Sequence, residues 1–240
     1  MIIRIDAVSD VGLVRSNNED MALVQGGQLR DEKVMLVCEL PEQGCFSAIV
    51  ADGIGGYDKG EVASEMATNS FDHFLNKLPE GKEANDIILA LKQWCQQTNA
   101  DILAAAAGSG MGCTLTGIFT YWGMAFLVNI GDSRTYRYRN EYLKQMTNDH
   151  SERNRTDDDS VPSNLIYNAL GVPEAFIDVQ QTKLIEGDIF LICSDGLTDM
   201  ITDEEIECIL ARGGGAEDLV QAAKNAGGLD NITVIVLNVS

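Results

Sequence analysis

Acidic residues recur in this sequence where a short apolar run begins or ends. Asp52 directly follows the apolar run 48–51, and Asp195 follows the run 189–193 with one serine in between. Apolar runs of this length are typical of buried strands, so acids at their mouths could gather at one end of a sheet. The acids placed in this way are Glu19, Asp20, Asp52, Asp132, Asp195 and Asp230.

A cluster of these carboxylates would call for a metal ion. Taken one at a time, each acid fits an ordinary turn position. Together they would form a group of like charges that is unstable unless cations neutralise it. Oxygen ligands without His or Cys select hard cations, so the pattern predicts a Mg²⁺ or Mn²⁺ site.

A glycine-rich turn follows Asp52. Its glycines, which allow a close approach of the backbone to a bound group, are Gly53, Gly55, Gly56 and Gly60. A dinucleotide fingerprint would need a further glycine at Asp58. A P-loop would need Lys and Ser or Thr where Glu61 and Val62 stand. The turn therefore fits a hard-cation site better than a phosphate cradle.

The composition limits the partners of the chain. Its 240 residues are 45% hydrophobic and 22% charged, a mix that suits a single domain over residues 1–240. A net charge of -20 argues against binding to nucleic acid. No apolar run is long enough to cross a membrane, and the N-terminus does not resemble a signal peptide. We expect a cytoplasmic protein, and a monomer.

Histidine and cysteine leave little room for other catalytic schemes. The chain has two histidines, His73 on a predicted helix and His150 in a polar segment. Ser-His-Asp and Cys-His schemes need a histidine beside the nucleophile. The six cysteines form no C-x-x-C pair and are expected to be reduced core residues. Carboxylates and metal ions remain the expected chemical tools.

The elements that would position these acids are strands and helices in separate batches. This order argues against regular βαβ alternation and predicts an α+β fold with helices outside antiparallel sheets. Strands 33–39 and 45–51 are expected to be neighbours, and the strands of 113–146 to form a meander. Helices are expected at 61–78, 85–107, 202–211 and 216–225. The polar segment 148–164 is expected to lie mobile on the surface.

Eight blocks, in order and over nearly the whole chain, resemble the metal-dependent Ser/Thr protein phosphatases, the protein phosphatase 2C-like (PPM) family of bacterial type. One block would be weak evidence, whereas eight in the right order are very specific. The blocks are Asp10–Asp20, Val50–Glu61, Gly112–Leu115, Gly131–Arg134, Thr147–Ser151, Ala169–Gly171, Cys193–Leu197 and Asp230–Thr233.

The resemblance implies a four-layer α-β-β-α sandwich, with two central antiparallel sheets flanked by helices and a two-metal site at one edge. It implies that Asp52 bridges two Mn²⁺ or Mg²⁺ ions and that the Gly53 carbonyl is a further ligand. Asp20 would be a direct or water-mediated ligand and Glu19 an outer one. Asp195 and Asp230 would bind on the other side, and Asp132 with Asp195 would match a third metal position.

The resemblance also implies a reaction. A water or hydroxide held by the ions would attack phosphoserine or phosphothreonine of a protein substrate, and Arg15 would grip the phosphate. The catalytic residues would be Arg15, Asp52 and Asp195. Ile54 stands where some relatives have a histidine proposed as general acid, so a water on the metal would protonate the leaving group instead.

The partners implied are phosphorylated proteins and an opposing Ser/Thr kinase. The flap at about 148–170 is shorter than in many bacterial relatives, which weakens any inference about the substrate. Two alternatives stay open from the residues alone. One is a pseudophosphatase that binds phosphoproteins without hydrolysing them, and the other is a phosphatase of small phosphoesters or nucleotides.

Overall fold

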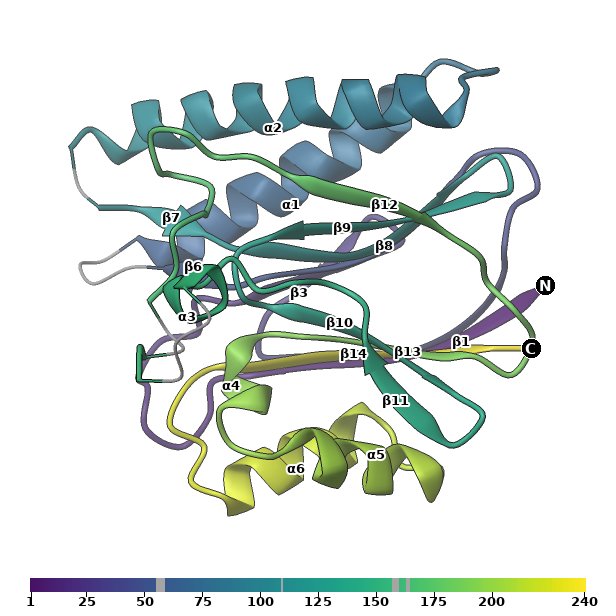
Figure 1. The fold of residues 1–240 in the computed structure, drawn as a ribbon, viewed down its shortest axis with the longest axis vertical. Coiled ribbons are helices and arrows are strands. Elements are labelled where there is room, and N and C mark those ends of the chain that lie inside the picture. The colour runs from purple at the N-terminus through teal and green to yellow at the C-terminus, as the bar shows by residue number, and fades with distance from the viewer. Residues whose placement is uncertain (55–58, 109, 157–159, 163–164) are drawn as a thin grey trace.

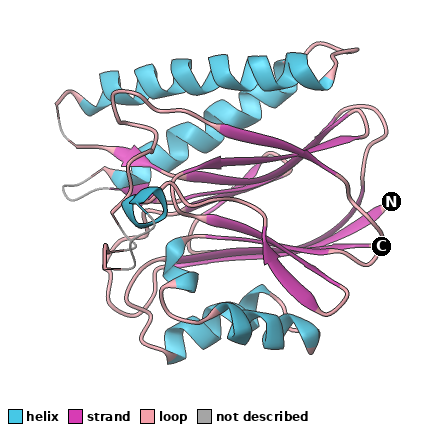
Figure 2. Ribbon diagram, viewed as in Figure 1, coloured by secondary structure: helices cyan, strands magenta, loops and turns pink. Residues whose placement is uncertain are grey.

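Two six-stranded antiparallel sheets lie face to face, and helices cover the outer face of each sheet (Figures 1 and 2). The structure is a computed structural model that describes residues 1–54, 59–108, 110–156, 160–162 and 165–240. The predicted α+β class and the four-layer α-β-β-α sandwich are thus confirmed.

The first sheet combines strands from both ends of the chain. β1 pairs with β14 from Ile3 opposite Val239 to Asp10 opposite Ile232. The two termini therefore lie close together at one end of the sandwich (Figure 1). In spatial order the strands are β11 (Tyr142–Gln145), β10 (Arg134–Arg139), β13 (Ile189–Cys193), β14 (Ile232–Val239), β1 (Ile2–Asp10) and β4 (Lys33–Glu39).

The second sheet is built from the middle of the chain. A separate two-stranded ladder joins β6 (Gly53–Ile54) to β7 (Gly112–Cys113). In spatial order the strands of the second sheet are β12 (Asp178–Thr182), β9 (Met124–Ile130), β8 (Leu115–Tyr121), β5 (Cys45–Ala51), β2 (Met21–Val24) and β3 (Gly27–Leu29).

The helices close the two outer faces. α1 (Gly60–Lys77) and α2 (Ala84–Ala106) cover the second sheet, and α5 (Asp203–Ala211) and α6 (Ala216–Asn225) cover the first. Thr202 caps α5 as predicted, with its side chain accepting from the Glu205 N–H. Two short helices, α3 (Glu152–Thr156) and α4 (Asp195–Thr198), lie near one end of the sandwich. No described helix is both long and apolar enough to cross a membrane.

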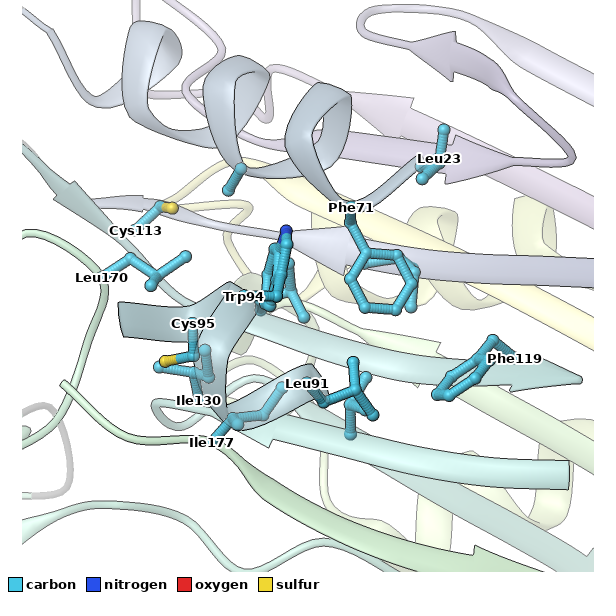
Figure 3. Close-up of a cluster of buried hydrophobic side chains, with 14 of the residues drawn as sticks. Leu23, Phe71, Leu91, Trp94, Cys95, Cys113, Phe119, Ile130, Leu170 and Ile177 are labelled. Atoms are coloured by element: carbon cyan, nitrogen blue, oxygen red, sulfur yellow. The ribbon is translucent and has the colours of Figure 1, made fainter. Parts of the chain in front are cut away.

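Apolar side chains fill the spaces between the layers. Phe71 of α1 packs edge-on against Trp94 of α2 and Phe119 of β8, with ring centroids 5.1 and 5.8 Å away (Figure 3). Phe71 is fully buried, so truncation to Ala should cost about 3–5 kcal/mol. Because both faces of each sheet are covered, β5 is apolar along nearly its whole length rather than alternating.

Two predictions of strand neighbours were wrong. β4 and β5 are joined by a loop but lie in opposite sheets, β4 beside β1 and β5 between β2 and β8. The predicted meander is two hairpins, β8–β9 in the second sheet and β10–β11 in the first. β4 and β5 are both apolar along most of their length, so the apolar pattern locates a strand but does not select its sheet.

Candidate metal centre

Four of the predicted aspartates come together at one end of the sandwich. Asp52 follows β5, Asp132 follows β9, and Asp195 opens α4 just after β13. Asp20 directly precedes β2. The negative charges of Asp20, Asp132 and Asp195 all act on Asp52, which makes Asp52 the common neighbour of the group.

Asp52 carries the strongest effect of this crowding. Burial raises its pKa well above the ordinary value, and the three neighbouring carboxylates raise it further. A hydrogen bond between the Asp52 and Asp195 side chains raises the pKa of Asp52 and lowers that of Asp195. This hydrogen bond therefore favours the neutral form of Asp52 and the charged form of Asp195. The Asp52 N–H donates to Thr114 Oγ1 at 3.0 Å, which fixes the backbone at the end of β5.

The other three carboxylates are also difficult to ionise. Burial raises the pKa of Asp20 to about 7, although Ser194 Oγ donates to its Oδ2 at 2.7 Å and favours the charged form. Burial and then the charge of Asp195 raise the pKa of Asp132 to about 7. Burial and then Asp199 raise the pKa of Asp195 to about 6. Burial and mutual repulsion thus both oppose full ionisation of the cluster.

Asp230 lies beside this cluster and is paired with Arg15. Arg15 Nη2 donates to Asp230 Oδ2 at 2.7 Å, with 53% of the Arg15 side chain and 40% of the Asp230 side chain exposed. The hydrogen bond that Arg15 donates to Asp230 raises the pKa of Arg15 most, and the charges of Asp230, Glu19 and Asp195 raise it further. Arg15 is therefore placed at the rim of the acids.

Glu19 and the glycines form a tightly packed wall. A Cβ added to Gly60 would lie 2.8 Å from Glu19 Oε2, and one added to Gly53 would lie 2.5 Å from the Gly60 carbonyl oxygen. At Gly53 the clash would be with backbone atoms, so only glycine fits there, whereas a side chain at position 60 would displace the Glu19 carboxylate. Ser64 Oγ donates to the Glu19 carbonyl at 2.6 Å, so α1 holds this backbone in place. The predicted turn residues Gly55, Gly56 and Asp58 lie outside the described residues.

The chemistry of the donor set fits a hard cation. All the gathered side chains offer oxygen, and added positive charge would remove the repulsion that raises their pKa values. Within the described ranges, however, no three His, Cys, Asp or Glu side chains form a ready-made cage for an ion. Asp20 accepts from Ser194, the side chain of Asp52 is hydrogen-bonded to that of Asp195, and Asp230 accepts from Arg15. The last two pairings would have to loosen before an ion could bind.

Comparison with known proteins identifies the family. A sequence model described as protein phosphatase 2C matches residues 22–213. The chain belongs to this family. It is therefore a phosphoprotein phosphatase, as the motif blocks predicted. The serine/threonine phosphatase stp of Listeria monocytogenes is 32% identical over 248 residues, covering 95% of this chain and 93% of that protein.

Solved structures agree with the assignment to protein phosphatase 2C. The serine/threonine phosphatase of S. agalactiae has a TM-score of 0.84 at 26% identity, covering 99% of this chain and all of that one. The catalytic domain of PstP, solved in complex with two manganese ions, has a TM-score of 0.77 at 32% identity over the full length of both chains. Against full-length PstP of Mycobacterium tuberculosis, the chain spans 45% of the relative.

The sequence analysis did not identify Asn231, which joins the N-terminal loop of this phosphatase to its last strand. The side chain of Asn231 accepts from the Glu19 N–H at 2.8 Å and donates to the carbonyls of Val11 and Asn17 at 3.0 and 2.9 Å. It therefore ties the loop that carries Arg15 to the start of β14. Asn231 stood in a quoted motif block, but an asparagine before a strand reads as a turn residue.

The start of the flap is anchored, contrary to the expected mobile surface segment. Arg134 makes a paired contact with Asp149, with Nη2 2.7 Å from Oδ2. His150 is 2% exposed, and its Nδ1 accepts from the Gly131 N–H at 3.0 Å. The loop that carries Asp132 is thus tied to the flap. The flap residues 157–159 and 163–164 lie outside the described residues.

Proposed function

We propose that this chain hydrolyses phosphoserine and phosphothreonine in proteins at a two-metal Mn²⁺ or Mg²⁺ centre, and that it opposes a Ser/Thr kinase in the cytoplasm. The observation that carries the proposal is the group of crowded carboxylates around Asp52, whose pKa values are raised by burial and by their mutual repulsion. The manganese ions in the structure of the relative PstP support the choice of metal.

The carboxylates have assigned roles in this proposal. Asp52 would help to hold both ions, because the charges of Asp20, Asp132 and Asp195 all act on it. Asp20 and the Gly53 carbonyl, with Glu19 behind them, would hold one ion, and Asp195 and Asp230 would hold the other. Asp132 together with Asp195 offers a place for a third ion. The bound ions would lower the pKa of a water so that it can attack phosphorus, and would neutralise charge on the phosphoryl group.

Arg15 changes partners in this proposal. In the structure its guanidinium is committed to Asp230. When Asp230 turns to a cation, the guanidinium loses that partner and is left at the rim with its donors free. A guanidinium offers two parallel N–H donors that match a phosphate, so Arg15 would then orient the substrate.

The surrounding residues keep the carboxylates in place during the reaction. Ser194 Oγ holds one oxygen of Asp20, and Thr114 Oγ1 holds the backbone of Asp52 and contacts Ser133 Oγ at 2.7 Å. Ser133 follows Asp132, so this contact joins the loop of the third-ion acid to that of the bridging acid. In this proposal these groups act by positioning the carboxylates.

A substrate comparison tests the proposed function. Initial rates with a phosphothreonine peptide, a small aryl phosphate and free nucleotides should be measured with Mn²⁺, with Mg²⁺ and with chelator. We expect turnover of the peptide and the aryl phosphate that requires the metal and returns when Mn²⁺ is restored. Binding of phosphopeptide without turnover at any metal concentration would indicate a pseudophosphatase. Preference for nucleotides would indicate a phosphatase of small phosphoesters, and full activity after metal removal would exclude the mechanism.

A further inference from the structure

β4 is an edge strand with an unusual amount of exposed apolar surface. It lies at the end of the first sheet, and within the described part of the chain no strand pairs with its outer side. Met35, Leu36 and Val37 are 81%, 40% and 69% exposed. An open apolar edge of this kind is a template for pairing with another chain.

The free hydrogen-bonding groups of β4 can be assigned from its pairing with β1. The backbone N–H of Leu40 donates to the carbonyl of Met1, and the N–H of Ser9 donates to the carbonyl of Glu32. Bonded positions alternate along an antiparallel pair, so the even-numbered residues of β4 face β1. The backbone groups of Lys33, Met35, Val37 and Glu39 therefore point away from the sheet.

This free edge is complementary to itself. We propose that β4 pairs antiparallel with β4 of a second copy of this chain, with Leu36 opposite Leu36 on the two-fold axis. Met35 then lies opposite Val37, and Lys33 lies opposite Glu39, at both ends of the pair. Every outward N–H and C=O of the strand is used, because all the bonded positions are odd-numbered.

Side-chain direction supports this arrangement. Opposite residues of an antiparallel pair point to the same face of the sheet. Lys33 contacts Glu217 of α6, with Nζ 3.1 Å from Oε1, so the odd-numbered side chains of β4 point to the helix-covered face. Both partners of that contact are about 70% exposed, which leaves the Lys33 ammonium accessible to a second carboxylate. The apolar pairs of Met35 and Val37 lie between the two charged pairs.

Other registers are less favourable. Sliding one copy by two residues in one direction sets Val37 opposite Val37 and Lys33 opposite Pro41, which has no N–H to donate. Sliding it the other way sets Asp31 opposite Glu39, two like charges. Only the register centred on Leu36 matches both the charges and the hydrogen bonds. This proposal departs from the monomer that the sequence analysis expected.

Sedimentation equilibrium over a concentration series tests the charge pairing. The wild-type 240-residue chain should rise with concentration from 26.0 kDa toward twice that mass. Lys33→Glu and Glu39→Lys should each shift the midpoint at least about tenfold upward in concentration, because each sets like charges opposite one another. An equimolar mixture of the two variants should associate again, since each then meets its opposite charge. Glu217→Ala is the control, because it removes only the intrachain contact of Lys33, and it should leave the dimer unchanged.

Cysteine cross-linking tests the register. At a non-bonded antiparallel pair the Cα atoms lie about 4.5 Å apart, within disulfide range. Mild oxidation of Leu36→Cys should therefore yield a covalent dimer, while Met35→Cys and the wild type should not. Phosphatase activity per chain serves as the test of folding, since none of these residues belongs to the carboxylate group. A monomer at every concentration, open-ended aggregates, or a dimer that survives both charge variants would overturn the proposal.

Discussion

At the scale of single residues, the ion pair between Arg15 and Asp230 joins a residue that we propose binds substrate to one that we propose binds a metal ion. The contact is 2.7 Å long and largely open to solvent, so it contributes little to stability. A pair of this kind can exchange partners at little cost. We therefore propose different binding roles for the two residues, with Arg15 binding the phosphate and Asp230 binding a cation.

Arg15→Ala should raise KM for a phosphopeptide while the protein stays folded. Loss of a charged hydrogen-bond partner of the phosphate should cost roughly 1.5–3 kcal/mol of transition-state stabilisation. This cost lowers kcat/KM about tenfold or more. Steady-state kinetics at saturating Mn²⁺ would measure the effect. Arg15→Lys is the matched control and should recover only part of it, since the paired donors are lost. Unchanged kinetics in Arg15→Ala would make Arg15 an ordinary surface residue.

Asp132→Ala should lower kcat and move the Mn²⁺ dependence to higher concentration. The physical reason is that Asp132 lies close enough to Asp195 for their negative charges to repel, and that it offers an oxygen for a weakly held ion. Tight binding of the first two ions should persist, which calorimetric titration can show. Ser133→Ala leaves the carboxylate intact but removes its link to Thr114, and it should have a smaller effect. The same kcat at every Mn²⁺ concentration would leave Asp132 as a turn residue.

The acids could be predicted one by one from the sequence because each stands at the end of an apolar run. The residues that position these acids could not be predicted in this way. Ser194, Thr114 and Asn231 act through hydrogen bonds that span 174, 62 and 212 positions of the chain. Nothing in the local sequence distinguishes such a serine, threonine or asparagine from a turn residue.

At the scale of elements, the positions of strands and helices followed from apolar periodicity, but the pairing of strands did not. β4 and β5 occupy the predicted ranges and yet lie in different sheets. Each long strand of a covered sandwich is apolar enough to fit either sheet. The choice depends on long-range packing, such as Ile5 and Ile235 meeting Phe46 and Ile118 between the sheets.

The flap provides a prediction at the same scale. Arg153 Nε donates to the Val161 carbonyl at 2.8 Å, and Arg155 pairs with Glu152 and lies 5.5 Å from the centre of the Tyr167 ring. If these arginines also recognise phosphoproteins, replacing both by Ala should lower kcat/KM for phosphopeptides but not for a small aryl phosphate. The small substrate reaches the centre without touching the flap. Equal effects on both substrates, or none, would contradict a recognition role.

At the scale of the whole molecule, the metal-free protein carries crowded carboxylates in addition to a net charge of -20. The pKa values of Asp20 and Asp132 are raised to about 7 and that of Asp195 to about 6 in the folded state. The folded chain thus holds protons that the unfolded chain, with ordinary carboxyl groups, would release at the same pH. Linkage then makes the fold less stable as pH rises through these values.

We therefore expect the melting temperature of metal-free protein to rise as the pH is lowered from about 8 to about 5. Asp52→Asn should reduce this slope and stabilise the metal-free fold at about pH 8 by about 1 kcal/mol, or roughly 2–4 °C. The same variant should lose turnover. Scanning calorimetry with and without Mn²⁺ would measure the melting temperatures and rate assays the turnover, with Asp72→Asn, a half-buried acid of α1 outside the carboxylate group, as the control. A melting temperature that falls on acidification over this range would contradict the charge crowding.

β14 lies between β1 and β13 in the middle of the first sheet, and Asp230 and Asn231, just before it, hold the loop of Arg15. A ribosome makes these residues after every other described strand and helix of the sandwich. Until they emerge, β1 has no partner on one side and the loop of Arg15 lacks its contacts with Asp230 and Asn231. If Asp230 serves the metal centre as proposed, a nascent chain can gather most of its acids and still lack one ligand. We then expect phosphatase activity only after β14 has been made.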